Sequence, residues 1–291
     1  MAIPLLALLL VVASSLGWAG FDLLRKLLVG EIPPVALLFL LTAGSAPLFA
    51  VWMLAGGTAG PEPGYWLPAL GSVLINLVAN LLFLSGMRVA PISVSVPLLS
   101  LTPVFTTLLA IPLLGEIPAL SDVAGILLVI AGAIWLHWQP REGIQQPGAL
   151  KGAVMVALTA LLWSTTGPLD KLALARAPAQ FHGFFLNAAV AVGVFGVLVV
   201  QRGLGRGLED VGRVRAVPGP FVLALVVSSA ALGLQLLALP LMYVGTIETL
   251  KRGIGNFMAL LSGRLFFGET VTSRKALAVL LMAVGVGLIL T

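Results

Sequence analysis

The sequence contains no cysteine and only two histidines, His137 and His182. The absence of cysteine excludes disulfide bonds, iron–sulfur clusters and thiolate metal sites. Two histidines so far apart in the sequence also argue against a histidine-based metal centre. No G-x-x-x-x-G-K-[ST] motif occurs, so ATP-driven transport by this chain alone has no support. We therefore expect neither a cofactor nor a metal.

Charge is scarce as well. Charged residues make up 9% of the 291 positions and hydrophobic residues 59%, with a mean hydropathy of +1.12, whereas soluble domains are about 25% charged. So few charges cannot cover a globule in water, but a lipid bilayer removes that requirement. The net charge of +5 suits basic cytoplasmic loops and does not require nucleic acid as a partner. We predict an integral membrane protein surrounded by lipid.

Apolar segments long enough to cross a bilayer recur along the whole chain. About 20 residues span the roughly 30 Å of hydrocarbon, and helices satisfy their own backbone groups there. No basic region precedes the first segment, so we interpret it as a retained span and not as a cleaved signal peptide. The ten predicted spans are 3–24, 34–55, 67–86, 92–113, 119–138, 150–170, 181–201, 219–239, 242–266 and 272–290.

The chain also contains an internal repeat. The pattern Trp-x7-Lys-x6-Pro occurs at Trp18, Lys26 and Pro33, and again 145 residues later at Trp163, Lys171 and Pro178. A Gly-Glu pair ends a predicted helix at Glu116 and at Glu269. Because each half holds an odd number of spans, the second half enters the membrane from the opposite side. The predicted fold is all-α, with ten transmembrane helices in two inverted-topology repeats of five. The repeats cover residues 1–140 and 150–291, joined by a linker at 141–149.

Two pairs of segments carry a family resemblance. SLTPVFTTLLAIPLLGE with AGILLVIAGA, echoed by LLSGRLFFGE with AVLLMAVGVGLIL, resembles the paired EamA domains of the drug/metabolite transporter superfamily. The resemblance implies a ten-helix carrier with a central cavity and alternating access. It implies no particular substrate, because the superfamily moves amino acids, drugs, sugars, nucleotide sugars and phosphorylated sugars.

The distribution of basic residues predicts an orientation. Eleven of the 16 lie in the odd-numbered loops, two in the even-numbered loops, and three inside the ninth span. This bias makes the odd loops cytoplasmic and places both termini outside, whereas ten-helix members of the resembled family are usually drawn with both termini inside. We follow the charge count and predict a plasma (inner) membrane protein of a prokaryote.

The ninth span carries the first candidate site. Lys251 and Arg252 fall near its centre, where each charge costs roughly 2.5–3.5 kcal/mol. Glu248, Arg252 and Asn256 are four residues apart and share one helix face. We predict that they bind solute, with Glu248 restraining the arginine. A charge cluster that only fastens the two halves is the alternative. The Lys-Arg pair is similar to the phosphate-binding pair of plastid sugar-phosphate translocators.

The first and sixth spans carry the second candidate site. Their matching rows of residues are expected to line a cavity, with tryptophans beside the solute and charges at one end. Alternatively, the lysines extend from helix ends to the interface, each tied to a neighbouring aspartate. The residues assigned to solute binding here are Trp18, Trp163, Lys171 and, from the third span, Asn80. Those assigned to gating or proton coupling are Asp22, Lys26 and Asp170.

These features together predict a secondary active transporter that moves a small polar or anionic metabolite by alternating access. Two cations against one anion in the ninth span favour a carboxylate or phosphate on the solute, and a zwitterionic amino acid is the next choice. Coupling to protons or to a counter-solute is left open. The alternatives are an exporter of amino acids or drug-like solutes, a membrane-embedded enzyme and a non-transporting scaffold. We expect no enzyme, because no metal-binding carboxylate pair or nucleophile beside a base stands out.

Overall fold

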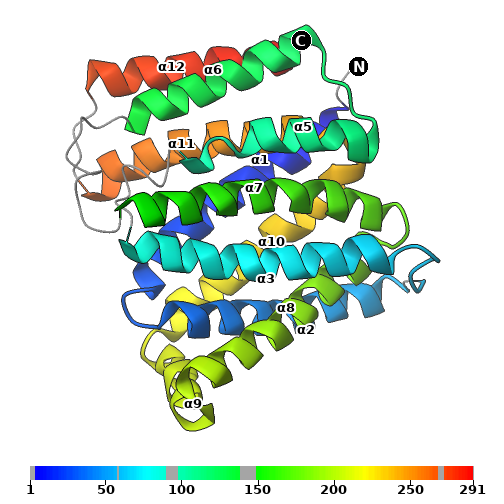
Figure 1. Ribbon diagram of the computed structural model, residues 1–291, viewed down its shortest axis with the longest axis vertical. Helices are drawn as coiled ribbons and strands as arrows, with labels where there is room; N and C mark the ends of the chain where they lie inside the picture. The colour runs from blue at the N-terminus through cyan, green and yellow to red at the C-terminus, as the bar shows by residue number, and fades with distance from the viewer. Residues whose placement is uncertain (1–3, 58, 90–97, 138–148, 268–271, 291) are drawn as a thin grey trace.

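The computed structural model describes residues 4–57, 59–89, 98–137, 149–267 and 272–290, and their regular structure is entirely helical (Figure 1). This confirms the all-α prediction. The helices are α1 (Leu5–Leu28), α2 (Pro34–Ala55), α3 (Trp66–Val89), α5 (Thr102–Leu114), α6 (Leu120–His137), α7 (Ala149–Leu174), α8 (Ala179–Arg202), α9 (Leu204–Gly212), α10 (Pro218–Ala238), α11 (Val244–Phe267) and α12 (Ser273–Ile289). Two short 3₁₀ turns, η1 (Arg213–Ala216) and η2 (Leu239–Leu241), flank α10.

Six of the described helices are long and apolar enough to cross a membrane. Two shorter apolar stretches, Thr102–Leu114 and Leu120–Leu136, accompany them. The count of ten spans stays a prediction, because residues 92–97 of the fourth predicted span lie outside the described ranges. The six spanning stretches are Leu5–Arg25, Pro34–Ala55, Trp66–Phe83, Leu150–Leu174, Ala179–Arg202 and Pro218–Leu241.

One helix was not foreseen. The sequence predicted only a loop between the seventh and eighth spans, but the chain forms α9 there. Its nine residues include three glycines and carry no long apolar run, so the pattern of a membrane span is absent. Arg202 and Arg213 pair with the buried carboxylate of Asp210, which holds α9 against the end of α8.

The connections separate into two sides of the molecule. Both termini and the α2–α3, α5–α6, α7–α8 and α10–α11 connections lie on one side, which we call the termini side (Figure 1). The α1–α2 connection and α9 lie on the other, which we call the basic side because most arginines of the helix ends gather there. This arrangement agrees with an even number of spans. Which side is cytoplasmic stays a prediction.

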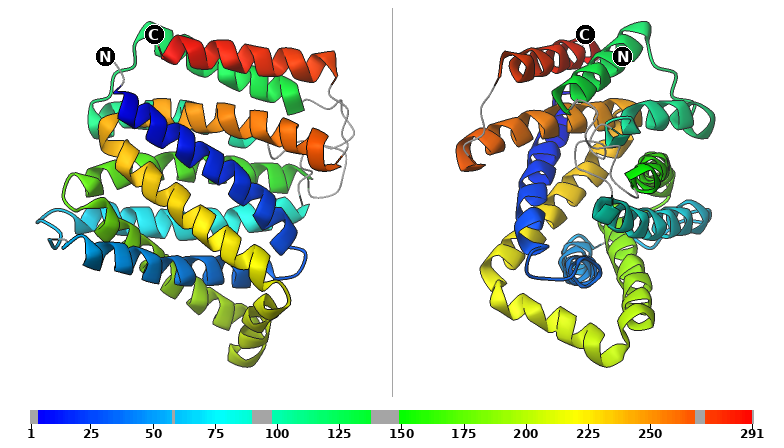
Figure 2. Two further views of the ribbon diagram at one scale, coloured as in Figure 1. Left: turned by 180° about the vertical axis from the view of Figure 1, so that it is seen from behind. Right: turned by 60° about the vertical axis from the view of Figure 1, so that its left-hand side comes forward.

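Helices from the two halves pack against each other in pairs. α1 packs on α10, α3 on α7, α2 on α8 and α6 on α12 (Figures 1 and 2). Small residues allow close approach: a Cβ added to Gly125 would lie 2.5 Å from the carbonyl oxygen of Gly285. The Ser14 hydroxyl of α1 donates to the Ala231 carbonyl of α10 at 2.8 Å, so polar bonds also join the halves.

Candidate functional site

Three charged residues of α11, Glu248, Lys251 and Arg252, lie close together between α5 and α12. The Lys251 ammonium donates to the Glu248 carboxylate one turn before it, and Glu248 is buried. The sequence favoured Arg252 as the partner of Glu248, which is wrong: the ion pair is with Lys251, whose position three residues away also places it on that face. Asn256 is buried and directs its amide to the sulfur of Met282 on α12 at 3.7 Å.

Arg252 is the cation of this cluster that lacks a counter-ion within the described ranges. Its Nη2 donates to the Thr102 hydroxyl at the start of α5 at 3.3 Å. Its Nε is buried and has no hydrogen-bond partner there. Guanidinium nitrogens are donors only, and an unmet buried donor is costly. The arrangement therefore suits an acceptor-rich group, such as a carboxylate or phosphate, approaching Arg252.

A second cluster ties the two halves together on the termini side. The Lys171 ammonium, from α7, donates to Glu116 Oε1 at 2.6 Å and to the Met242 carbonyl at 2.7 Å. The other carboxylate oxygen of Glu116 accepts from the backbone N–H of Val244 at 2.8 Å, at the start of α11. We call these four residues the clamp. Gly115, with φ of 68°, ends α5 in the left-handed conformation and turns the chain to place Glu116.

The clamp changes the interpretation of Lys171. The lysine does not extend to the interface beside Asp170, as one sequence hypothesis held. It lies in the protein interior and pairs with a carboxylate from the other half. Glu116 was interpreted as the end of a helix, and its 6% exposure shows how fully this carboxylate is committed to partners inside the protein.

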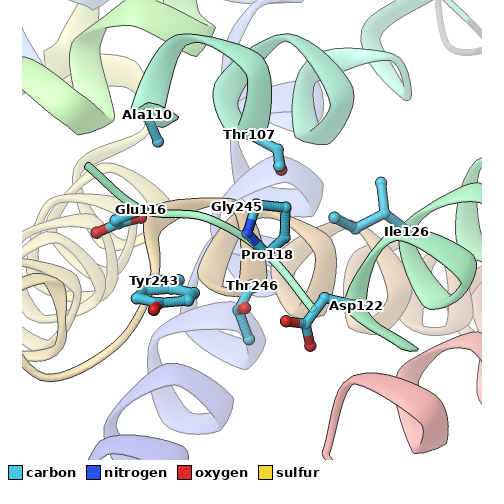
Figure 3. A pocket seen from close by; sticks show the side chains of 9 residues that line it. All are labelled: Thr107, Ala110, Glu116, Pro118, Asp122, Ile126, Tyr243, Gly245 and Thr246. Carbon is cyan, nitrogen blue, oxygen red and sulfur yellow. The ribbon is translucent and has the colours of Figure 1, made fainter. Parts of the chain in front are cut away.

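A hollow lies beside the clamp. It measures about 240 Å³, including space open to solvent, and lies between the α5–α6 connection and the start of α11 (Figure 3). A second hollow of about 540 Å³, also including open solvent, lies on the basic side next to Arg202 and Asp210. Lys251 and Arg252 line neither of these two hollows. The residues lining the first are Thr107, Ala110, Glu116, Pro118, Asp122, Ile126, Tyr243, Gly245 and Thr246.

A third cluster joins α3, α7 and α8, and we call it the tyrosine–histidine–aspartate network. The Asp170 carboxylate accepts from the Ser72 hydroxyl and lies 3.1 Å from His182 Nε2. His182 Nδ1 lies 2.9 Å from the Tyr65 hydroxyl. Tyr65 and His182 are 0% exposed and Asp170 is 5% exposed. Burial, and then the Asp170 charge, raises the pKa of the Tyr65 phenol.

Sequence reasoning missed two members of this network. Asp170 was a gating or proton-coupling candidate, but His182 was placed near a helix end in an unrelated context and Tyr65 was not singled out. His182 follows Asp170 by twelve positions across the α7–α8 turn, so both lie near the same end of an antiparallel helix pair. That spacing was the signal available, although it does not fix which helix faces meet.

The tryptophans predicted to flank the solute have separate partners. The Trp18 indole donates to the Gln235 side chain of α10 at 2.8 Å. The Trp163 ring packs against Phe83 of α3, with centroids 5.1 Å apart. Across the described ranges, no hydrogen bond or ion pair joins either indole to Arg252. Their role beside a solute stays a prediction.

The remaining candidates are distributed over two helices. Asn80 donates to the Asn76 carbonyl within α3 at 2.8 Å. Asp22 pairs with Arg25 at 2.9 Å near the basic end of α1, and its side chain is 63% exposed. The role of Asp22 in gating or proton coupling stays a prediction. The side chain of Lys26 lies outside what the structure describes.

Comparisons with known proteins give a consistent result. The model of the EamA-like transporter family matches residues 5–138, which confirms the resemblance predicted from the sequence. A solved structure described only as "Crystal structure of protein" superimposes with a TM-score of 0.75 at 20% identity, covering 97% of this chain and 95% of that one. At that identity the likeness shows the fold alone. No curated protein matches the chain.

Proposed function

We propose that the chain, whose residues 5–138 match the model of the EamA-like transporter family, is a secondary active transporter. The family match and the apolar helices support an integral membrane protein that carries small solutes. Our proposal adds that the solute is a small polar or anionic metabolite and that transport occurs by alternating access. The observation that carries the substrate class is the half-buried side chain of Arg252, whose buried Nε has no hydrogen-bond partner among the described residues.

The charge balance of α11 favours an anion. Glu248 is paired with Lys251, so these two charges compensate each other and Arg252 contributes a net positive charge. A charge at the centre of a spanning helix costs roughly 2.5–3.5 kcal/mol, which a carboxylate or phosphate on the solute would offset through two parallel hydrogen bonds. A zwitterion fits less well, because the Glu248 carboxylate that would bind its ammonium group is already paired with Lys251.

The contacts between the halves support the repeat that alternating access requires. Ser14 and Thr159 lie 145 residues apart. The Ser14 hydroxyl donates to the Ala231 carbonyl of α10 at 2.8 Å. The Thr159 hydroxyl donates to the Met155 carbonyl of its own helix at 2.9 Å and lies 3.4 Å from the Ala79 carbonyl of α3 in the other half. The α1–α10 and α3–α7 pairs are therefore equivalent when the two halves are exchanged. Together with the clamp, these contacts support a carrier closed on its termini side.

The alternatives fit less well. An exporter of amino acids or drug-like solutes would use the same cluster, and only the solute class distinguishes it. An enzyme has less support, because the family is one of transporters and no group of three metal-binding side chains occurs in the part of the chain that was described.

A thermal-shift assay tests the substrate class. The purified protein would be heated with glucose 6-phosphate, malate, glutamate or tetraphenylphosphonium, as wild type and as Arg252→Ala. A ligand at 100 times its Kd stabilises the native state by about 2.7 kcal/mol, which raises the melting temperature by several degrees. We expect an anion to stabilise the wild type and not Arg252→Ala.

Arg264→Ala is the matched control, because Arg264 lies on the same helix with an exposed side chain. This variant should respond to the anion as the wild type does. Equal stabilisation of all three proteins by the cation, with none by the anions, would contradict the assignment of Arg252 to the solute.

A further inference from the structure

We propose that the tyrosine–histidine–aspartate network is a proton-binding site and that it couples solute transport to proton movement. The coupling rests on the proposed function, whereas proton binding by the network does not. The three side chains come from the α2–α3 connection, α8 and α7, and all are buried. They form one continuous line of contacts on the termini side.

Hydrogen-bond accounting fixes how the network holds its protons. The Asp170 carboxylate is an acceptor, and its Oδ1 meets both the Ser72 hydroxyl and His182 Nε2. His182 Nε2 must therefore carry a hydrogen. In the neutral ring, Nδ1 is then an acceptor, and the Tyr65 hydroxyl donates to it across 2.9 Å. In this state every group has a partner and the network carries one negative charge.

One more proton fits without moving a heavy atom. The proton would add to His182 Nδ1, and this nitrogen would then donate to the Tyr65 oxygen. The hydroxyl hydrogen of Tyr65 would rotate away from the imidazole ring of His182. The proton comes from a hydronium ion of the solvent: one of its O–H bonds breaks as the Nδ1–H bond forms, water is released, and the reverse step returns the proton. The network then carries no net charge, because a buried carboxylate has gained an imidazolium as its counter-ion. Low local dielectric strengthens that pair.

Among the described residues, no other charged group near His182 compensates the negative charge of Asp170. Along α2 and α10, which pack against α8, no residue is titratable. α3 carries only Arg88, at its opposite end, and α9 contacts α8 at the basic side. On α7, Lys171 is held by Glu116. The Arg176–Glu62 pair nearby is exposed and 4.0 Å apart. A proton on His182 is therefore the compensating charge available to Asp170 among the described groups.

The network lies next to the clamp, which provides a physical link to the solute cluster. Asp170 precedes Lys171, and Lys171 bonds through Glu116 to the backbone of Val244. Val244 begins α11, and Glu248 follows one turn later. Protonation of His182 changes the net charge of the network beside the clamp lysine from minus one to zero, and so changes the electric field at Lys171. The clamp joins the two halves, so its strength sets how readily the termini side opens, and proton binding thereby biases solute access.

Nitrogen-15 NMR of histidine tests proton binding without any solute. The His137→Gln variant leaves His182 as the one labelled histidine, and it would be studied in lipid nanodiscs from pH 5 to 9. We expect the His182 shifts to report an Nε2–H tautomer at high pH and an imidazolium at low pH, since histidine is the side chain that ordinarily titrates in this range. In Asp170→Asn the imidazolium signal at the same low pH should be weaker than in the parent protein, because the compensating charge is lost. A ring that stays neutral throughout the range, or titrates identically in Asp170→Asn, would overturn the proposal.

Proteoliposomes test the coupling. Glutamine in place of His182 keeps one donor and one acceptor but cannot take the added proton. Uptake of labelled glucose 6-phosphate, malate and glutamate would be measured first as exchange at equal pH, and then under a gradient of one pH unit. One coupled proton per solute allows roughly tenfold accumulation in the wild type, since one pH unit corresponds to a factor of ten. In His182→Gln we expect uptake under the pH gradient to equal the exchange measured at equal pH, so that the ratio of the two falls to about one.

The outcomes separate the two proposals. Equal accumulation by His182→Gln and by wild type would refute coupling at this site while leaving the carrier intact. Wild-type protein that neither exchanges nor accumulates any of the three solutes would contradict the proposed function instead. The NMR titration would then still decide whether the network binds a proton.

Discussion

Removing the Glu116 carboxylate should open the termini side. In Glu116→Ala, the Lys171 ammonium loses its counter-ion at 2.6 Å and the Val244 N–H loses its acceptor at 2.8 Å. Breaking a buried ion pair by deleting one partner costs about 3–5 kcal/mol. If this ion pair stabilises the state that is closed on the termini side, its loss favours the open state. A loss of about 3 kcal/mol raises the population of the open state by about 150-fold.

The absence of cysteine makes the assay simple, because one introduced thiol has no background. Thr246 lines the hollow beside the clamp (Figure 3) and is 7% exposed. Thr246→Cys should react slowly with a water-soluble maleimide, at a rate proportional to the open population. In combination with Glu116→Ala, we expect the rate to rise by two orders of magnitude.

Glu62→Ala is the matched control. Glu62 pairs with Arg176 on the same side, but at 4.0 Å and with both side chains more than half exposed. Such surface pairs contribute about 0–1 kcal/mol, so labelling should change by less than about fivefold. A rate in Glu116→Ala that stays within the range of this control would refute the clamp as the contact that closes the termini side.

Three further predictions concern packing and titration. Gly285→Ala places a Cβ 2.6 Å from a backbone oxygen of α6, so it should lower the melting temperature, whereas Gly287→Ala, with nothing within 4 Å, should not. Trp18→Phe removes the hydrogen bond to its partner glutamine and should cost about 1 kcal/mol in denaturant unfolding. Burial raises the pKa of Tyr65 above its ordinary value of 10.0, so the unfolded chain ionises first and the stability due to the neutral phenol is lost as pH rises above 10. Tyr65→Phe should lose less stability over that range than Tyr243→Phe does, as followed by thermal melts from pH 9 to 11.

Much of the fold could be predicted because membrane spans are determined locally. A run of about 20 apolar residues bounded by glycine, proline or charge determines a helix by itself. The second predicted span, 34–55, has the same bounds as α2. The prediction missed α9, because a nine-residue helix between two spans lacks such a run. Its amphipathic pattern is too short to distinguish from a loop.

The candidate sites could be predicted only in part. A spacing of three or four residues limits which neighbours on a helix can meet, but it did not identify the partner of Glu248: the sequence favoured Arg252, and the ion pair forms with Lys251. Partners on different helices depend on the rotation and register of each helix, which one sequence does not reveal. Glu116 and Lys171 are 55 residues apart, and both were singled out without any indication that they meet. His182 was set aside for the same reason.

The contact between α6 and α12 has a consequence for the order of synthesis. The close approach at Gly125 joins a helix that ends at His137 to the last helix of the chain. At 5–20 residues per second, the ribosome completes α12 roughly 8 to 30 s after α6. During that interval the glycine face of α6 lacks the helix that covers it in the folded protein. This layer can therefore assemble only after α12 has been synthesised, and a chain truncated before α12 would leave that face of α6 without its packing partner.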